Sequence, residues 1–276
     1  MRGLTSVRDM RVEDLCLGVL SGIYWEVGPD LWEKLEKGFE IIPEKLRLRI
    51  FTEKDREVFT SVSPSFELKL RLGQEKHTVL ELKNTSTQEL FEKEFDPLTK
   101  TLLAFRLLKP GGIFLDCVHA VEQGLKRDIT YVSEPDFFPE YAFSLNEIKN
   151  LIAVLEKIQK IDFNNLPFRI ACTRFHRFYL DRFYEDKLVD LCIAFEAMFL
   201  QGERIRAPMG EVIGLACSML LGKNIDERKK IKEKINLAFS LRNDVVHGQY
   251  FNFNQIYDLI PDIEDYLRRS IAHLML

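Results

Sequence analysis

Three polar side chains near the end of one predicted helix are suited to act together. They are Arg242, Asn243 and His247, which lie within six consecutive residues of the sequence. A guanidinium binds phosphate oxygens through two parallel hydrogen bonds, and an imidazole exchanges protons near neutral pH. An amide beside them can orient either group. Together these groups could bind an anion and move a proton.

The position of Arg242 on its helix indicates more than a surface charge. On an ideal helix Arg242 continues a stripe formed by Ile231, Ile235 and Ala238. An arginine on such an apolar face is costly unless its charge meets an anion or opens into a polar cleft. The alternative is structural, because an arginine and a histidine near a helix end can simply cap carbonyl groups there.

His247 lies five positions after Arg242, so the two side chains diverge by about 140° around an ideal helix. One copy of the helix therefore cannot direct both at one phosphate unless its last turn unwinds. A symmetric homodimer would instead bring two copies of each side chain around one groove. Gly248, which follows His247 directly, is predicted to end the helix.

A carboxylate on another predicted helix is the candidate partner of Arg242. Glu196 is surrounded in sequence by Cys192, Phe195 and Phe199, in a helix that is apolar nearly all round. Because a buried carboxylate needs a partner, we expect Glu196 to contact Arg242 or a backbone donor and so to support the site indirectly. An exposed glutamate at the edge of its helix is the equally weighted alternative.

Two further arginines are candidates for RNA binding. Arg174 and Arg177 lie one helical turn apart within residues 168–184, where basic and aromatic side chains are interleaved. Such a segment can bind phosphates and stack against bases. The favoured interpretation is nevertheless a core helix whose rings pack and whose arginines are solvated.

The composition excludes several other kinds of protein. The 276 residues are 46% hydrophobic and 30% charged, and this hydrophobic content excludes general disorder. The formal net charge is −4, which excludes a predominantly basic surface of the kind that binds nucleic acids. The five cysteines form no CxxC pair, and the five histidines lack the spacing of metal ligands. We therefore expect no disulfide framework and no tightly bound metal. Glycine-rich nucleotide motifs are also lacking, so no cofactor is predicted.

Membrane association is not expected either. No apolar run approaches the length of a membrane span, and the first 15 residues carry acids and lack the apolar core of a secretory signal. These features favour a cytoplasmic protein whose cysteines are reduced.

The elements that must position these residues differ between the two halves of the chain. Residues 1–140 are predicted to form a mixed α+β module, and residues 141–276 an all-α bundle of five or six helices. Pro135 and Pro139 mark a linker between them. A protein partner or a ligand of the N-terminal module is compatible with this organisation.

The spacing of apolar residues predicts where the individual strands and helices lie in the sequence. In the first half, alternation predicts strands, and helical spacing predicts helices near residues 12–23 and over 96–108. The predicted strands are 46–50, 66–72, 77–82, 113–120 and 128–132. In the second half, Ser144 and Glu147 form a capping box ahead of the first helix. The later helices are predicted to begin near 167, 185, 209, 225 and 254.

Three separate segments of the second half carry a family resemblance. They are Tyr184–Asp190, an acidic helix start; Ile193–Ala197, an apolar helix with an embedded glutamate; and Leu241–Gly248, which reads LRNDVVHG. In this order they resemble the HEPN superfamily, and within it the Apea-like HEPN domain. The arginine and histidine of the third segment match the paired motif of that superfamily, and Asn243 matches the polar residue that follows the arginine.

The resemblance implies a metal-independent endoribonuclease that acts as a homodimer, in a toxin or defence setting. Arg242 would hold the phosphate, Asn243 would orient either the phosphate or His247, and two copies of His247 would share the acid and base roles. Some HEPN domains keep the fold without catalysis, so the alternative is a non-catalytic RNA- or protein-binding HEPN module. A purely structural dimerisation unit is a third, weaker alternative.

Overall fold

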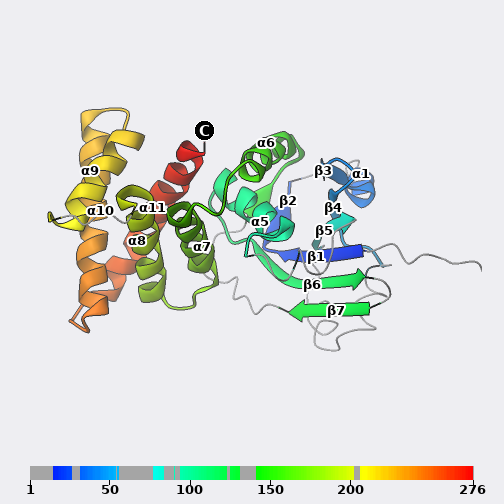
Figure 1. Cartoon of the computed structure of the whole chain (residues 1–276), viewed down its shortest axis with the longest axis horizontal. Helices are drawn as coiled ribbons and strands as arrows, with labels where there is room; N and C mark the ends of the chain where they lie inside the picture. The colour runs from blue at the N-terminus through cyan, green and yellow to red at the C-terminus, as the bar shows by residue number, and fades with distance from the viewer. Residues whose placement is uncertain are drawn as a thin grey trace, which may run out of the picture.

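A β-sheet and a group of helices lie side by side in the protein (Figure 1). The computed structural model describes residues 15–26, 32–53, 55, 77–83, 90, 94–122, 125–130, 141–201 and 206–275. Within these ranges, the strands of the sheet come from the first half of the chain and the second half is mostly helical. The predicted order, an α+β part followed by a helical region, is confirmed at this level.

Six strands form the sheet, and every pair of neighbours is antiparallel. Their order is β3-β4-β5-β1-β6-β7. The bounds are β1 Leu15–Ser21, β3 Phe39–Ile42, β4 Leu46–Ile50, β5 Thr78–Lys83, β6 Phe114–Glu122 and β7 Leu125–Thr130. The strands predicted near 46, 77, 113 and 128 are thus confirmed. The strand predicted over 66–72 and the linker prolines lie outside the described residues.

The helix predicted near residues 12–23 is wrong. Leu15–Ser21 is the central strand β1, and Ile23–Trp25 forms the short strand β2. The reason lies in the run LCLGVLS, which is apolar on both of its faces. Cys16 contributes to the main core on one face of the sheet, whereas Leu17 and Val19 belong to a smaller cluster with Val79 and Cys117. A short apolar run gives no periodicity that separates a strand from a helix.

Two helices and a strand join the sheet to the rest of the molecule. Helix α5 (Pro97–Leu108) begins at Asp96, as predicted, and packs against α6 (Ile148–Gln159). Helix α6 also contacts β3, and β8 (Tyr141–Phe143) pairs in parallel with β2. Elements that follow residue 140 in the sequence therefore pack with the N-terminal part. The capping box ahead of α6 is confirmed, because the Ser144 amide donates to Glu147 Oε2 at 2.9 Å.

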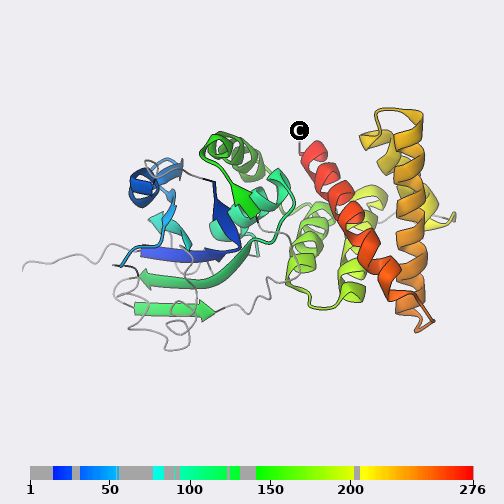
Figure 2. The same ribbon diagram turned by 180° about the vertical axis from the view of Figure 1, so that it is seen from behind.

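Five helices form the remaining group, with α8 in contact with all four of the others. They are α7 Leu166–Leu180, α8 Tyr184–Leu200, α9 Met209–Leu221, α10 Ile225–Val246 and α11 Phe253–Leu274. Together with α6 they confirm the predicted helices of the second half. Figure 2, from behind, shows α11 crossing the group diagonally, with α10 at its outer edge. The central place of α8 explains why its sequence is apolar on nearly every side.

A fully buried arginine lies between the two parts. Arg106, on α5, donates from Nη1 to Nδ1 of His176 at 2.8 Å and from Nη2 to the carbonyl of Ile113 at 3.0 Å. Its guanidinium also lies 4.2 Å from the ring centroid of Tyr179. Burial lowers the pKa of Arg106 to about 9. The charge is thus held by a carbonyl, an imidazole and a ring that come from both parts of the chain.

Candidate functional site

Helix α10 positions the three residues that sequence reasoning singled out. It begins at Asn224, whose side chain accepts a hydrogen bond from the amide of Glu227 at 2.9 Å. It ends in a turn where Gly248 adopts a φ of 65°, and the amide of Gln249 donates to the carbonyl of Asp244 at 2.8 Å. This is the glycine-dependent helix end that the sequence predicts. Residues 242–247 therefore form the last turn of the helix.

Arg242 faces the interior of the helical group. Its Nη2 lies 3.4 Å from Oε1 of Glu196 on α8, and its Nη1 donates to Oδ1 of Asn243 at 3.2 Å. The predicted contact between Glu196 and Arg242 is confirmed. The two side chains are 24% and 19% exposed, so the pair lies at the border between core and surface. This places three of the predicted site residues in one cluster.

The Glu196–Arg242 pair is incompletely satisfied. Nε of Arg242 and Oε1 of Glu196 are buried and make no hydrogen bond to any residue that the structure describes. Burial raises the pKa of the Glu196 carboxyl, while the charge of Arg242 opposes this shift. Such atoms also occur elsewhere in the described residues, for example at Asn236 Oδ1, so they do not by themselves mark a functional position. In the cluster they leave one donor and one acceptor without a hydrogen bond.

The side chain of His247 makes no hydrogen bond or ion pair with this cluster. It caps the helix through its amide, which donates to the carbonyl of Asn243 at 3.0 Å, and its side chain is exposed. Within the described residues the imidazole makes no hydrogen bond or ion pair. The structure thus brings Arg242 and Asn243 together but leaves His247 on the outer surface, as the angle of about 140° between them requires.

Two hydrophobic residues close to His247 in the sequence are exposed. Val246 is 53% exposed and Tyr250 is 95% exposed. Exposed hydrophobic side chains can contribute to contact with another molecule.

Arg174 and Arg177 lie apart from the cluster and share one carboxylate. Arg174 Nη1 lies 2.6 Å from Oδ1 of Asp190, and Arg177 Nε lies 3.5 Å from Oδ2 of the same residue. The Asp190 side chain is only 4% exposed. These contacts join α7 to α8, as expected for a core helix. Contrary to the favoured interpretation, the arginines are not simply solvated, because a buried carboxylate pairs with both of them. Three aromatic residues of this segment, Phe175, Phe178 and Tyr179, are buried, whereas Phe183 is 60% exposed.

Sequence reasoning missed a second group of buried polar residues. Glu264 on α11 accepts a hydrogen bond from the hydroxyl of Tyr179 at 2.8 Å, and both are buried. Lys187 on α8 is buried as well and donates to the carbonyl of Phe178 at 2.9 Å. The signal was available, because Glu264 interrupts an apolar stripe of α11 in the same way that Arg242 interrupts one of α10.

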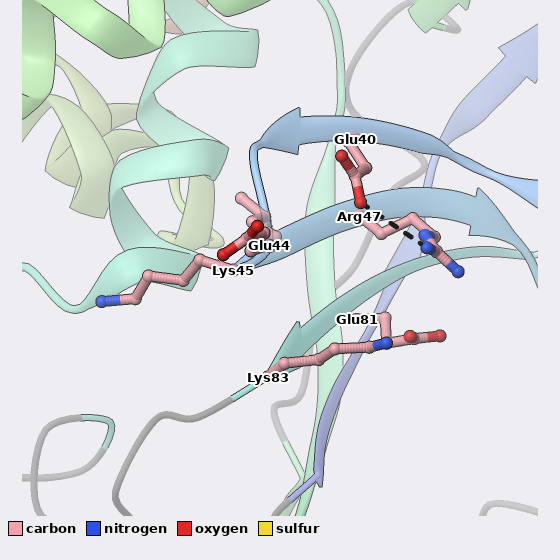
Figure 3. A pocket seen from close by; sticks show the side chains of 7 residues that line it. Glu40, Glu44, Lys45, Arg47, Glu81 and Lys83 are labelled. Atoms are coloured by element: carbon pink, nitrogen blue, oxygen red, sulfur yellow. Dashed lines mark ion pairs between the residues drawn. The ribbon is translucent and has the colours of Figure 1, made fainter.

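A charged recess on the sheet offers no comparable chemistry. Figure 3 shows side chains from β3, β4, β5 and the turn between β3 and β4 around it. Three carboxylates (Glu40, Glu44 and Glu81) lie among three cations (Lys45, Arg47 and Lys83), and Arg47 lies 3.7 Å from Glu40. Balanced charges of this kind select no particular ligand.

Searches for similar proteins found nothing: no family model matches the chain, and neither does any curated protein or solved structure. Among the described residues, no three His, Cys, Asp or Glu side chains are arranged to hold a metal ion. In the same part of the chain, no helix is both long and apolar enough to cross a membrane.

Proposed function

We propose that the protein is a metal-independent endoribonuclease of the HEPN type that acts as a homodimer through Arg242, Asn243 and His247. The observation that carries this proposal is the arrangement of the last turn of α10. A guanidinium held by Glu196 and an exposed imidazole occupy one helix end, close in the sequence to two exposed hydrophobic residues.

Glu196 gives Arg242 a defined position. A guanidinium that has a carboxylate on one edge loses little rotamer freedom when a phosphate binds to its remaining donors. Arg242 is 19% exposed, so part of its side chain is accessible from outside. In the reaction it would bind a non-bridging oxygen of the scissile phosphate and stabilise the charge that develops there.

The imidazole supplies proton transfer. In a metal-independent cleavage, a base removes the proton of the 2′-hydroxyl, and the 2′-oxygen attacks the neighbouring phosphorus. The bond to the 5′-oxygen breaks, and an acid protonates that leaving oxygen. The products are a 2′,3′-cyclic phosphate and a 5′-hydroxyl. One His247 would act as base and the His247 of a second copy as acid.

A homodimer could bring together the side chains of Arg242 and His247, which diverge on a single helix. Val246 and Tyr250 flank His247 and are exposed. A two-fold contact through these residues would bury apolar surface and bring two imidazoles to one groove.

The second candidate function is a non-catalytic module that binds RNA or protein. The observation that favours it is the pairing of Arg242, whose Nη atoms already contact Glu196 and Asn243. In this case the arginine would stabilise the contact between α8 and α10, and the exposed surface around His247 would bind the partner.

Cleavage of end-labelled RNA in the presence of EDTA distinguishes the two functions. We expect the unaltered protein to cut RNA and leave DNA of the same sequence intact, because DNA has no 2′-hydroxyl. His247→Ala is expected to lower the rate about a hundredfold or more. Arg242→Lys keeps the positive charge beside Glu196 but removes the planar guanidinium that can donate two parallel hydrogen bonds to a phosphate. It should also impair cleavage.

His273→Ala is the matched control, because His273 is an exposed histidine of α11 that has no place in the proposed site. It should cut RNA at the unaltered rate. Cleavage that survives His247→Ala would contradict the catalytic proposal. RNA that is bound but remains whole would support the binding module instead.

A further inference from the structure

A pocket of about 470 Å³ opens where the N-terminal part meets the helices. Pro110 and Gly111, just after α5, form one side of it. The other sides come from α7, α8 and α11. Helix α10 contributes no lining residue, so the pocket is separate from the proposed ribonuclease site.

Aromatic rings form much of the pocket wall. Tyr184 and Tyr257 lie edge to face with their ring centroids 5.0 Å apart, and Phe178 lines the same pocket. Tyr257 is 53% exposed, which places it at the opening. Rings in this arrangement offer faces and edges against which a planar ligand can stack. The volume is within the range of small-molecule sites and suits a ligand the size of a nucleoside.

Two buried charged residues also line the pocket. Lys187 is 1% exposed and Glu264 is 5% exposed. Oε1 of Glu264 accepts a hydrogen bond from Tyr179 and lies 3.8 Å from Nε of Arg268, whereas Oε2 accepts a hydrogen bond from no described residue. Burial raises the pKa of Glu264 to about 7, so near neutrality its carboxyl group can either donate or accept a hydrogen bond. An ammonium and a carboxyl group in one pocket wall complement a ligand edge that carries both an acceptor and a donor.

The charge of the lining argues against an anionic ligand. Asp258, Glu264 and Asp265 supply three carboxyl groups, and Lys187 is the single cation among the lining residues that the structure describes. Arg268, which does not line the pocket, pairs with both Glu264 and Asp265. The charges of the lining and of Arg268 thus nearly balance, and a phosphate would meet little net attraction here. The geometry points to an uncharged nitrogen heteroaromatic ligand, a purine nucleoside, whose ring stacks on the face of Tyr257 and whose edge hydrogen-bonds to Lys187 and Glu264.

Titration of the full-length protein with 2-aminopurine riboside, a fluorescent purine nucleoside, tests this proposal. Stacking on the ring of Tyr257 should quench the probe in a saturable way, and adenosine should compete with it. Ribose 5-phosphate, which has no base, should not compete. Tyr257→Ala is expected to weaken binding about tenfold through the loss of the stacking partner.

Tyr24→Ala is the matched control, because Tyr24 is 60% exposed and does not line the pocket. It should bind the probe as the unaltered protein does. Glu264→Gln should also weaken binding, with far-UV circular dichroism to show that the fold is kept. The proposal is overturned if quenching does not saturate, or if the two tyrosine variants bind equally. His247→Ala should leave binding unchanged, so this result is independent of ribonuclease activity.

Discussion

The side chains that matter most in this protein are charged groups at the edge of its core. Arg242 and Glu196 meet at 3.4 Å with about a fifth of each side chain exposed. Glu264 is more deeply buried and depends on the hydroxyl of Tyr179. A charged group in such a place is retained only if its partners offset the cost of removing it from water.

Burial of Glu264 gives the stability of the protein a defined pH dependence. Its folded-state pKa of about 7 lies above the ordinary value of 4.5. The folded protein therefore keeps a proton that the unfolded chain releases, and the resulting stability is complete below about pH 4.5 and is lost as the pH rises through 7. Relative to Glu264→Gln, we expect the free energy of unfolding to fall by about 3 kcal/mol over this range.

Urea unfolding of both proteins at several pH values measures this difference. Glu156→Gln, on an exposed face of α6, serves as control and should follow the unaltered protein. If Glu264→Gln and the unaltered protein show parallel pH profiles, Glu264 does not hold the proton.

At the scale of elements, the end of α10 decides where His247 lies. Gly248 adopts the left-handed φ of 65° that closes the helix, and a Cβ placed there would meet no atom within 4 Å. Replacement of this glycine should therefore cost only the conformational strain of the backbone.

We expect Gly248→Ala to lower the free energy of unfolding by about 1 kcal/mol, because alanine avoids the left-handed conformation. Gly248→Asn should recover part of this loss, since asparagine tolerates that conformation better. Thermal unfolding followed by circular dichroism gives the comparison. Equal stability of all three proteins would mean that the turn relaxes to a conformation open to any residue.

Some of the helices and strands could be predicted from the sequence, and others could not. The helices from Ser144 onward were predictable because caps, glycines and helical spacing agree with one another. The Glu196–Arg242 contact followed from a charge on an apolar stripe, and Glu264 could have been found in the same way. Strand β1 was not predictable from periodicity, because both of its faces are apolar and only its partners β5 and β6 determine its structure.

At the scale of the whole molecule, exposed apolar side chains lie at several places on the helical group. We compare two of these places: one is near His247 and includes Val246 and Tyr250, and the other includes Leu215 and Met219 on α9. The proposed function assigns the two-fold contact to the first of these places, because only that contact brings the imidazoles together.

Sedimentation velocity tests this assignment. The unaltered protein should sediment as a dimer, and Tyr250→Asp should shift it to the monomer by placing a charge in an apolar contact. Leu215→Asp makes the same change at a residue that is 55% exposed on α9 and should remain dimeric. A dimer that dissociates with Leu215→Asp but persists with Tyr250→Asp would place the contact on α9.

The buried guanidinium of Arg106 determines which helices must be kept together if the chain is divided. His176 and Tyr179 belong to α7, yet they complete the environment of a charge that α5 carries. Without α5, helices α7 to α11 would lack the guanidinium that contacts the imidazole of His176 and the ring of Tyr179. Anyone who grafts this helical group onto another protein would therefore have to transplant α5 with it.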